Sequence, residues 1–476
     1  MIKVDTIAYS SFFERYNTIV IPEYQRAYRW NAEKVEELLE DLREFFITKP
    51  TPDLNYYMGS ILLFDNSEKN HFEIIDGQQR ITTLTLLQYC LKGELQENQN
   101  LTYNSHISFY NIKIVNAYLQ KQKKLLEQLN DKGVFNKIQL TIIESDNEDN
   151  AFTFFDSQNN RGVSLSPDDY LKAYHLRAVK SELLQAKLAQ EWETVVFKSQ
   201  DKNYETSLLF LFSKILYRSR TWRGSNIVPE NKDDILKTFQ KQTHQSVDNK
   251  YNLFVNPNNI KYNSVIVNDD DTTTMVSYNK FADNGKTNLP FSLRQPIYKG
   301  LNFFQFTHKY HAIHTLLFFS KLDEHSPIKK VREYYSAIYD NDMSVFLKHY
   351  MQLCLVLYYD MFAENDLLNA IKYFDYFIGR VRIEKKSVKK ETVYNLMKND
   401  FKLNLLDVIT QAYFPNDIFI FISEQDYISY VYINEKLKTK DGARYRYKKR
   451  VSDFYSSEME KSKKVKPLKD RILWIK

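Results

Sequence analysis

The chain has 476 residues, enough to bury a large core and to form about two to four domains of ordinary size. Only 10 residues are glycine while 15% are aromatic, which excludes collagen-like and glycine-rich repeat classes and favours a helical protein packed with Phe and Tyr. The formal net charge is +6, a modest excess that does not by itself establish a polyanionic partner.

The two cysteines, Cys90 and Cys354, lie in apolar helical patterns and cannot build a disulfide framework or a four-cysteine zinc site. This usage fits a reducing compartment. No apolar run approaches the ~18 uncharged residues of a membrane-spanning helix, and the first residues lack the pattern of a secretory signal. We therefore expect a cytoplasmic protein with no membrane partner.

Residues 1–180 predict a small α/β domain. Strands are indicated at 17–22, 56–64, 71–76 and 139–144, and helices at 32–46, 78–95, 110–129 and 150–155. Asn31 is the expected cap of the first helix, and Ser166 begins a further helix that should run to about Lys180. The order of strands and helices favours a small α/β unit over a helical bundle.

The rest of the chain predicts helices almost throughout. We expect a helical extension at 181–247, a polar loop or insertion rich in Asn, Asp, Thr and Ser at 248–296, and a helical C-terminal domain with a basic end at 297–476. The fold class is therefore α+β, with a small α/β N-terminal domain followed by a large, mostly α-helical region.

The most informative motif lies where the strand at 71–76 meets the following helix. Gly77 permits a tight turn there, and the free N–H groups and positive dipole end of the helix favour a phosphate. Arg80 offers a planar, two-pronged donor, and Asp76 is available for magnesium or water. The glutamines can orient water or sugar hydroxyls, and the threonines can donate hydrogen bonds. The candidate residues are Asp76, Gly77, Gln78, Gln79, Arg80, Thr82 and Thr83.

A plainer interpretation of this motif is open, because Asp-Gly is common in turns and the polar side chains could be solvated. The segment Ile21 to Trp30 is similarly ambiguous. Its two arginines, one glutamine and three aromatic residues could stack a base and bind phosphate, or could form a hydrophobic staple with solvated arginines. Asn159 and Arg161, in a polar turn before Ser166, complete an anion site or belong to an ordinary capped connection.

Taken together, three patterns resemble the N-terminal domain of GmrSD-type modification-dependent restriction enzymes. They are Ile-Pro-x-Tyr-Gln-Arg-x-Tyr-x-Trp, Asp-Gly-Gln-Gln-Arg-x-Thr-Thr and Phe-x-x-x-Asn-x-Arg-Gly-x-x-Leu-Ser-x-x-Asp-x-x-Lys, in this order between about 10 and 180. The resemblance implies a ParB/sulfiredoxin-like fold that binds a nucleoside triphosphate and couples its hydrolysis to control of DNA cleavage. It assigns the catalytic and nucleotide-binding residues to the Asp76–Arg80 motif, with Tyr24, Gln25 and Arg26 beside it and Asn159 and Arg161 as further candidates.

The chain departs from full-length relatives that end in a histidine-based nuclease domain, because no histidine follows His349. We therefore expect no such nuclease in this sequence, and either a separate nuclease subunit as a partner or a chain that acts as a sensor only. His308, His311 and His314 are spaced along one helix, but without a matching carboxylate motif they indicate packing and surface, not a metal site.

The segment Lys436 to Arg450 holds eight Lys and Arg residues with Tyr445 and Tyr447 between them, and Lys461 to Lys466 is also basic. Such a segment could neutralise DNA phosphates and stack unpaired bases, or could be a solvated basic tail. The candidate DNA-binding residues are Lys436, Lys438, Arg444, Arg446, Lys448, Lys449 and Arg450.

The sequence therefore predicts a triphosphate-hydrolysing component of an anti-phage restriction system that regulates cleavage by a partner nuclease. The alternative is a noncatalytic DNA- or partner-binding adaptor. The expected cofactors are a nucleoside triphosphate and magnesium. The choice among GTP, ATP and CTP, the DNA modification sensed, and self-association into a homo-oligomer remain open.

Overall fold

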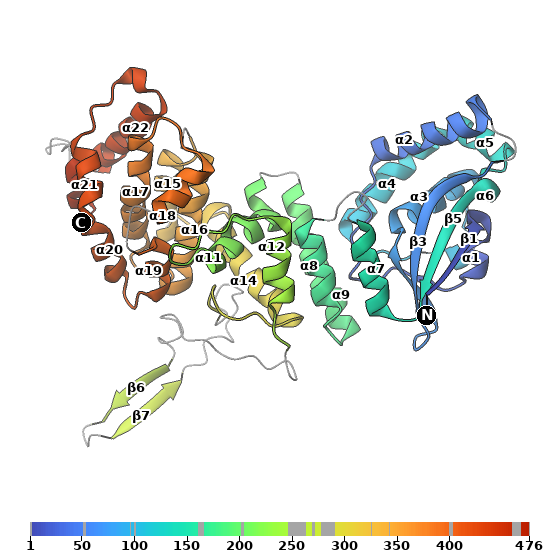
Figure 1. Ribbon diagram of the computed structural model, residues 1–476, viewed down its shortest axis with the longest axis horizontal. Coiled ribbons are helices and arrows are strands. Elements are labelled where there is room, and N and C mark those ends of the chain that lie inside the picture. The colour runs from blue at the N-terminus through green and yellow to red at the C-terminus, as the bar shows by residue number, and fades with distance from the viewer. Residues whose placement is uncertain are drawn as a thin grey trace. The chain divides into compact units, whose positions relative to one another are not determined.

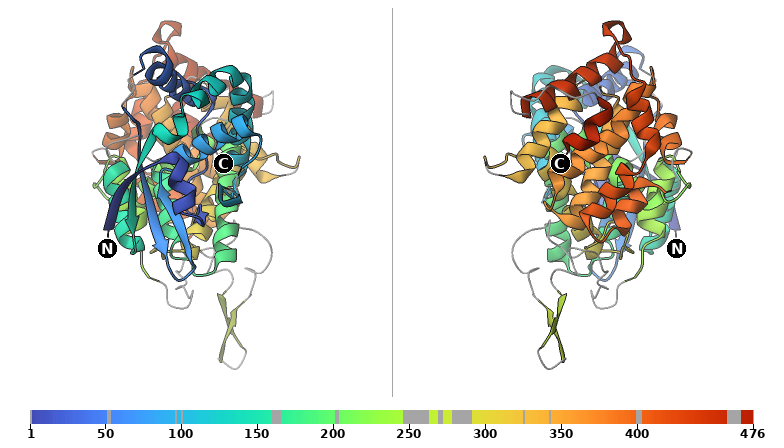
Figure 2. Two further views of the ribbon diagram at one scale, coloured as in Figure 1. Left: turned by 90° about the vertical axis from the view of Figure 1, so that its right-hand side faces the viewer. Right: turned by 90° about the vertical axis from the view of Figure 1, so that its left-hand side faces the viewer.

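The chain forms two compact units, Met1–Lys202 (unit 1) and Asn203–Lys476 (unit 2), in the computed structural model shown in Figures 1 and 2. No helix in the described part of the chain is long and apolar enough to cross a membrane. The structure describes residues 2–50, 54–95, 97–99, 101–159, 166–200, 204–245, 263–268, 272–277, 291–324, 326–341, 343–398, 403–458 and 468–475.

Unit 1 is built on a five-stranded mixed sheet in the order β1-β5-β3-β4-β2. The pairs β1–β5 and β3–β4 are antiparallel, whereas β5–β3 and β4–β2 are parallel. The edge strand β1 was not predicted from the sequence, and its apolar residues Ile2 and Val4 are exposed. The strands are β1 (Ile2–Ala8), β2 (Ile19–Val20), β3 (Tyr56–Asn66), β4 (His71–Asp76) and β5 (Ile138–Ser145).

Helices cover both faces of this sheet (Figure 1). Ile61, Ile74 and Leu140 belong to the same buried cluster as apolar side chains of α2, α3, α4 and α5. Leu62 and Ile75, which alternate with them and point to the other face, are also buried, and α7 packs there against β3, β4 and β5. The helices are α1 (Phe12–Arg15), α2 (Ala32–Arg43), α3 (Gln78–Lys92), α4 (His106–Lys121), α5 (Lys123–Asp131), α6 (Val134–Lys137) and α7 (Glu148–Asn159).

Two further helices complete unit 1. α8 (Pro167–Leu176) packs against α9 (Glu182–Gln200), and α9 also packs against α4. The predicted cap at Asn31 is confirmed, because its side chain accepts a hydrogen bond from the Lys34 N–H at 3.0 Å. Unit 1 extends to Lys202, so it includes α9.

Unit 2 is mostly helical, and α16 (Val345–Phe362) is buried along most of its length beside α17 (Leu367–Glu384). In the segment 248–296, the structure describes a two-stranded hairpin of β6 (Asn263–Val267) and β7 (Thr273–Ser277) and the residues from 291. The expected α/β domain followed by a large helical region is confirmed. The other helices are α10 (Leu208–Phe210), α11 (Tyr217–Thr221), α12 (Lys232–Leu236), α14 (Leu301–Phe318), α15 (Pro327–Ile338), α18 (Lys390–Lys398), α19 (Leu405–Gln411), α20 (Pro415–Ser423), α21 (Asp426–Ile433) and α22 (Ala443–Glu458).

Candidate functional site

The predicted corner between a strand and a helix is present in unit 1. β4 ends at Asp76, Gly77 has a φ of 95° in the left-handed region, and α3 begins at Gln78. A Cβ atom at Gly77 would lie 2.3 Å from Cδ1 of Ile61, so a larger residue would displace a buried side chain as well as strain the backbone. The corner therefore requires glycine.

Two arginine–carboxylate pairs lie around this corner. Nη2 of Arg80 is 3.4 Å from Oδ2 of Asp76, and Nη2 of Arg29 is 3.5 Å from Oδ1 of Asp169. The Arg80 guanidinium also lies against the backbone of Gly59 in β3, where a Cβ atom would come within 2.6 Å of Nη1. Both pairs are longer than a strong charge-assisted hydrogen bond, so both guanidiniums keep donor capacity.

A third guanidinium, that of Arg26, is only partly exposed and has no ion pair or hydrogen bond with any residue that the structure describes. Burial lowers its pKa; Asp169 and Asp76 act to raise the pKa, while Arg29 and Arg80 lower it. Three guanidiniums and two carboxylates thus lie within electrostatic reach of one another. This group, called the arginine cluster below, has an excess of positive charge.

Gln78 points into a small polar chamber beside the cluster. Its side chain is 3% exposed, and its Oε1 atom has no hydrogen-bond partner among the described residues. The chamber has a volume of about 40 Å³ and is also lined by Gln25, Arg26, Lys172 and Glu193. A buried amide oxygen without a donor is costly, so this chamber suits a small polar guest.

Gln79 does not face the chamber, and the expectation that it orients water or sugar hydroxyls is wrong. Its Oε1 accepts from the backbone N–H groups of Arg29 at 2.8 Å and Trp30 at 3.3 Å, and its Nε2 donates to the carbonyl of Ala27 at 3.1 Å. Both ends of the amide are occupied by backbone. Gln79 therefore holds the loop that carries Arg26 and Arg29.

The two threonines are also structural, which corrects the prediction that they donate to phosphate. The buried hydroxyl of Thr82 donates to the carbonyl of Gln78 at 2.7 Å and contacts the hydroxyl of Tyr103. That of Thr83 donates to the carbonyl of Gln79 at 2.8 Å. Back-bonding to the residue four positions earlier satisfies these hydroxyls within α3.

Tyr24 and Gln25 anchor the loop to β4. The hydroxyl of Tyr24 donates to Oε2 of Glu73 at 2.8 Å, and Nε2 of Gln25 donates to the carbonyl of Ile75 at 2.6 Å. Tyr24 lines a separate cavity of about 560 Å³ together with His71 and Glu73. The three neighbouring residues therefore face different cavities. Gln25 and Arg26 line the small chamber, whereas Tyr24 does not.

The predicted residues of the polar turn cannot be placed in the site. Asn159 is the last residue of α7, and its side chain lies outside the described part of the chain. Arg161 lies outside the described residues altogether.

Asp168 and Glu193 were not assigned to the site from the sequence. Asp168 is 8% exposed, its Oδ1 has no hydrogen-bond partner among the described residues, and burial together with Asp169 raises its pKa to about 6. Acids in the first turn of a helix are so common that this signal is easily assigned to capping alone. Glu193 lies in no motif, so no sequence signal distinguished it.

The basic end of the chain is only partly available to DNA. Lys436, Lys438 and Lys449 are exposed, whereas Nε of Arg444 donates to the carbonyl of Ile383 at 2.6 Å and Nζ of Lys448 lies 3.0 Å from Oε2 of Glu435. Arg446 and Arg450 lie on α22 together with Arg444, Lys448 and Lys449. The segment 461–466 lies outside the described residues.

Tyr447 cannot stack a base, which corrects that expectation. It is 3% exposed, and its hydroxyl donates to Oδ1 of Asp375 at 3.1 Å.

His314 of α14 is buried and packs against aromatic rings. The His314 ring stacks on Phe210 at a centroid distance of 5.3 Å, and burial lowers its pKa to about 3. Within the described ranges, no group of three or more His, Cys, Asp and Glu side chains is arranged to hold a metal ion.

Comparison with known families divides the chain between residues 176 and 184, which is inside unit 1. Residues 9–176 match the model of the GmrSD restriction endonuclease, N-terminal domain, which confirms the resemblance and indicates a component of a restriction system. Residues 184–439 match a family of unknown function, DUF7834, and because this match covers more than half of the chain, the protein belongs to that family. No curated protein matches the chain.

Proposed function

We propose that unit 1 binds a nucleoside triphosphate at the arginine cluster and hydrolyses it. The observation that carries the proposal is Arg26, a partly buried guanidinium with no partner among the described residues, near Arg29 and Arg80. Like charges gathered in a partly buried site need a compensating anion, and guanidiniums match phosphate oxygens in geometry. The start of α3 adds free N–H groups to the same corner.

The residues of the cluster also fit a magnesium ion. Magnesium is usually held by one or two carboxylates together with substrate phosphates, and Asp76 and Asp169 supply such oxygens beside the arginines. When bound, the ion would neutralise charge on the phosphates. Arg26, Arg29 and Arg80 would then orient the same phosphates, while Gln79 keeps the loop in place.

We infer that hydrolysis regulates cleavage of foreign DNA by a separate nuclease within a restriction system. This inference rests on the GmrSD-type N-terminal domain.

The proposal is tested by measuring phosphate release from GTP, ATP and CTP by the full chain with magnesium, with and without DNA. We expect release from at least one triphosphate. Absence of release from all three under both conditions would contradict hydrolysis, and absence of binding as well would contradict the nucleotide site.

A second candidate function is a noncatalytic DNA-binding adaptor, favoured by the exposed Lys436, Lys438 and Lys449. Phosphate contacts release counterions, so DNA affinity should fall steeply with added salt. DNA binding that is absent or independent of salt would remove this candidate.

A further inference from the structure

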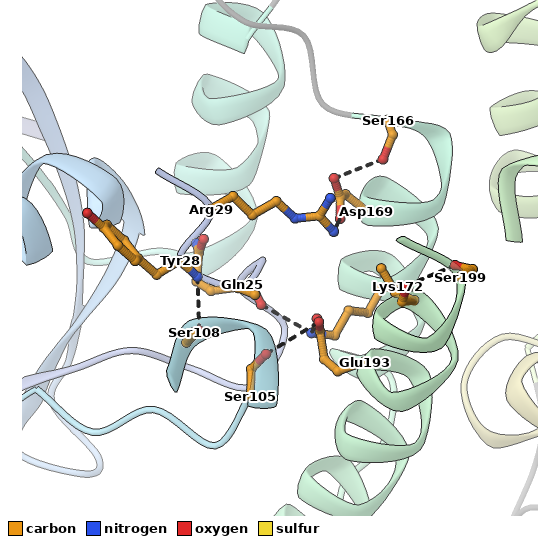
Figure 3. A network of polar contacts seen from close by, with 12 residues as sticks. Gln25, Tyr28, Arg29, Ser105, Ser108, Ser166, Asp169, Lys172, Glu193 and Ser199 are labelled. Atoms are coloured by element: carbon orange, nitrogen blue, oxygen red, sulfur yellow. Dashed lines mark hydrogen bonds and ion pairs between the residues drawn. The ribbon is translucent and has the colours of Figure 1, made fainter. Parts of the chain in front are cut away.

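Helix α9 contributes a buried ion pair next to the small chamber (Figure 3). Nζ of Lys172, on α8, lies 2.7 Å from Oε1 of Glu193, on α9, and the two side chains are 3% and 6% exposed. Such a pair is a weak source of net stability, because desolvation of both charges offsets most of their attraction. The position of this ion pair beside the small chamber therefore suggests a role other than stability.

The pair holds the main chain of the loop that carries Arg26. Nζ of Lys172 also donates to the backbone carbonyl of Gln25 at 3.2 Å, immediately before Arg26. Without Glu193, this ammonium would be a buried charge that lacks its anionic partner. The Glu193 carboxylate thus keeps the Lys172 ammonium directed at the Gln25 carbonyl.

The neighbouring contacts fix the loop on its other sides. Ser108 accepts from the Tyr28 N–H at 2.9 Å, Asn111 donates to the Tyr28 carbonyl at 2.8 Å, and Gln79 binds the backbone from Ala27 to Trp30. These contacts all lie after Arg26. Before Arg26, the Gln25 side chain is bound to β4, and the Gln25 carbonyl is held by Lys172.

We propose that Glu193 is a positioning residue of the nucleotide site, acting through Lys172 and the Gln25 carbonyl to set the direction of the Arg26 guanidinium. The inference rests on the proposed function. Glu193 lies outside the segment that matches the GmrSD N-terminal domain and inside the segment that matches the second family. The nucleotide site is therefore completed by the first helix of the second family's segment, and a change in α9 would alter how unit 1 binds its nucleotide.

A double substitution distinguishes a role of the Lys172–Glu193 pair in positioning Arg26 from a role in stability alone. In the full chain, Lys172→Met with Glu193→Leu removes both buried charges, and replacing a buried ion pair with apolar residues is often neutral or stabilising. A purely structural pair therefore predicts unchanged melting and unchanged nucleotide binding. The positioning role predicts nearly unchanged melting but a Kd for the preferred magnesium triphosphate raised at least tenfold, since the Gln25 carbonyl has lost its donor.

Two further measurements make the result decisive. Amide hydrogen exchange of residues 24–29, measured without nucleotide, should be faster in the double variant. Glu193→Gln keeps the side-chain shape but leaves the buried Lys172 ammonium without its anion, so it should lower the melting temperature and raise the Kd at least threefold. Measured well below its melting temperature, its Kd decides the question if the double variant does not fold. The matched control is Glu148→Gln, which alters the Arg177–Glu148 ion pair in the same unit and should leave the Kd within twofold of wild type.

The possible failures are distinguishable. If wild type binds a triphosphate and the folded variants bind it equally well with unchanged exchange, Glu193 is only structural and the inference is overturned. If wild type binds none of GTP, ATP or CTP, the proposed function fails, and the nucleotide-positioning role of Glu193 fails with it.

Discussion

Each unit has an arginine that is at least partly enclosed, Arg26 in unit 1 and Arg471 in unit 2, but the surroundings of the two side chains differ. In unit 2, Arg471 is fully buried and paired with Asp375, and its Nη atoms also donate to the hydroxyls of Tyr334 at 2.7 Å and Tyr447 at 3.0 Å. In unit 1, Arg26 has no partner among the described residues and lines a chamber. An enclosed arginine with protein partners supports architecture, whereas a partly enclosed arginine without them indicates a ligand.

The largest expected effect is a loss of stability on substitution of Arg471 in unit 2. Substituting Arg471 with Met leaves the buried Asp375 carboxylate without its cation, which should lower the free energy of unfolding of unit 2 by about 3–5 kcal/mol. Chemical denaturation measures this loss. Nucleotide binding by unit 1 should be unchanged under native conditions. If the substitution weakened nucleotide binding as strongly as it lowered the stability of unit 2, the assigned difference between the two arginines would be contradicted.

In the arginine cluster, the expected effect is on binding. Replacing Arg80 with Ala removes a charged hydrogen bond to phosphate and should weaken triphosphate binding by about 1.5–3 kcal/mol. Calorimetric titration measures the change. The matched control is Arg43→Ala, since Arg43 forms an exposed pair with Glu40 in the same unit. Equal weakening by both substitutions would remove the special role of Arg80.

Asp168 gives a pH-dependent effect on stability. Its pKa is raised from 3.8 to about 6, so the folded state binds a proton more tightly than the unfolded state. The stabilisation is full below about pH 4 and is lost as the pH rises through 6, because the buried carboxyl group then ionises. Asp168→Asn, which stays neutral, should therefore raise the free energy of unfolding by on the order of 2 kcal/mol at pH 7.5 and by little at pH 4. A gain that is the same at both pH values would contradict this assignment.

The smallest expected effect concerns the exposed lysines of unit 2. Changing Lys436, Lys438 and Lys449 together to Ala should weaken DNA binding modestly and reduce its salt dependence by about three phosphate contacts. Electrophoretic mobility shifts at several salt concentrations test this. Lys34, exposed on α2 of unit 1, offers a control position. An unchanged salt dependence would exclude these lysines from a DNA interface.

Local sequence signals predicted the corner of the site well. The order of β4, Gly77 and α3 follows from a strand pattern, a residue that tolerates positive φ, and a helical pattern. The cap at Asn31 follows from its own chemistry. Such features depend on neighbours in the chain, which the sequence displays directly.

The roles of single polar side chains were harder to predict. Gln79, Thr82 and Thr83 stand in the same motif as Arg80, but the burial of α3 turns them toward backbone and tyrosine hydroxyls. Glu193 joins the site only because α9 packs beside α8. These assignments depend on contacts between distant segments, which residue spacing does not encode.

The most direct test of the account is a titration of the full chain and of its Arg26→Ala variant with each magnesium triphosphate. We predict that wild type binds at least one triphosphate and that the variant binds it at least tenfold more weakly while melting within a few degrees of wild type. Equal affinities in the two proteins would contradict the claim that the Arg26 guanidinium, which has no partner among the described residues, binds phosphate.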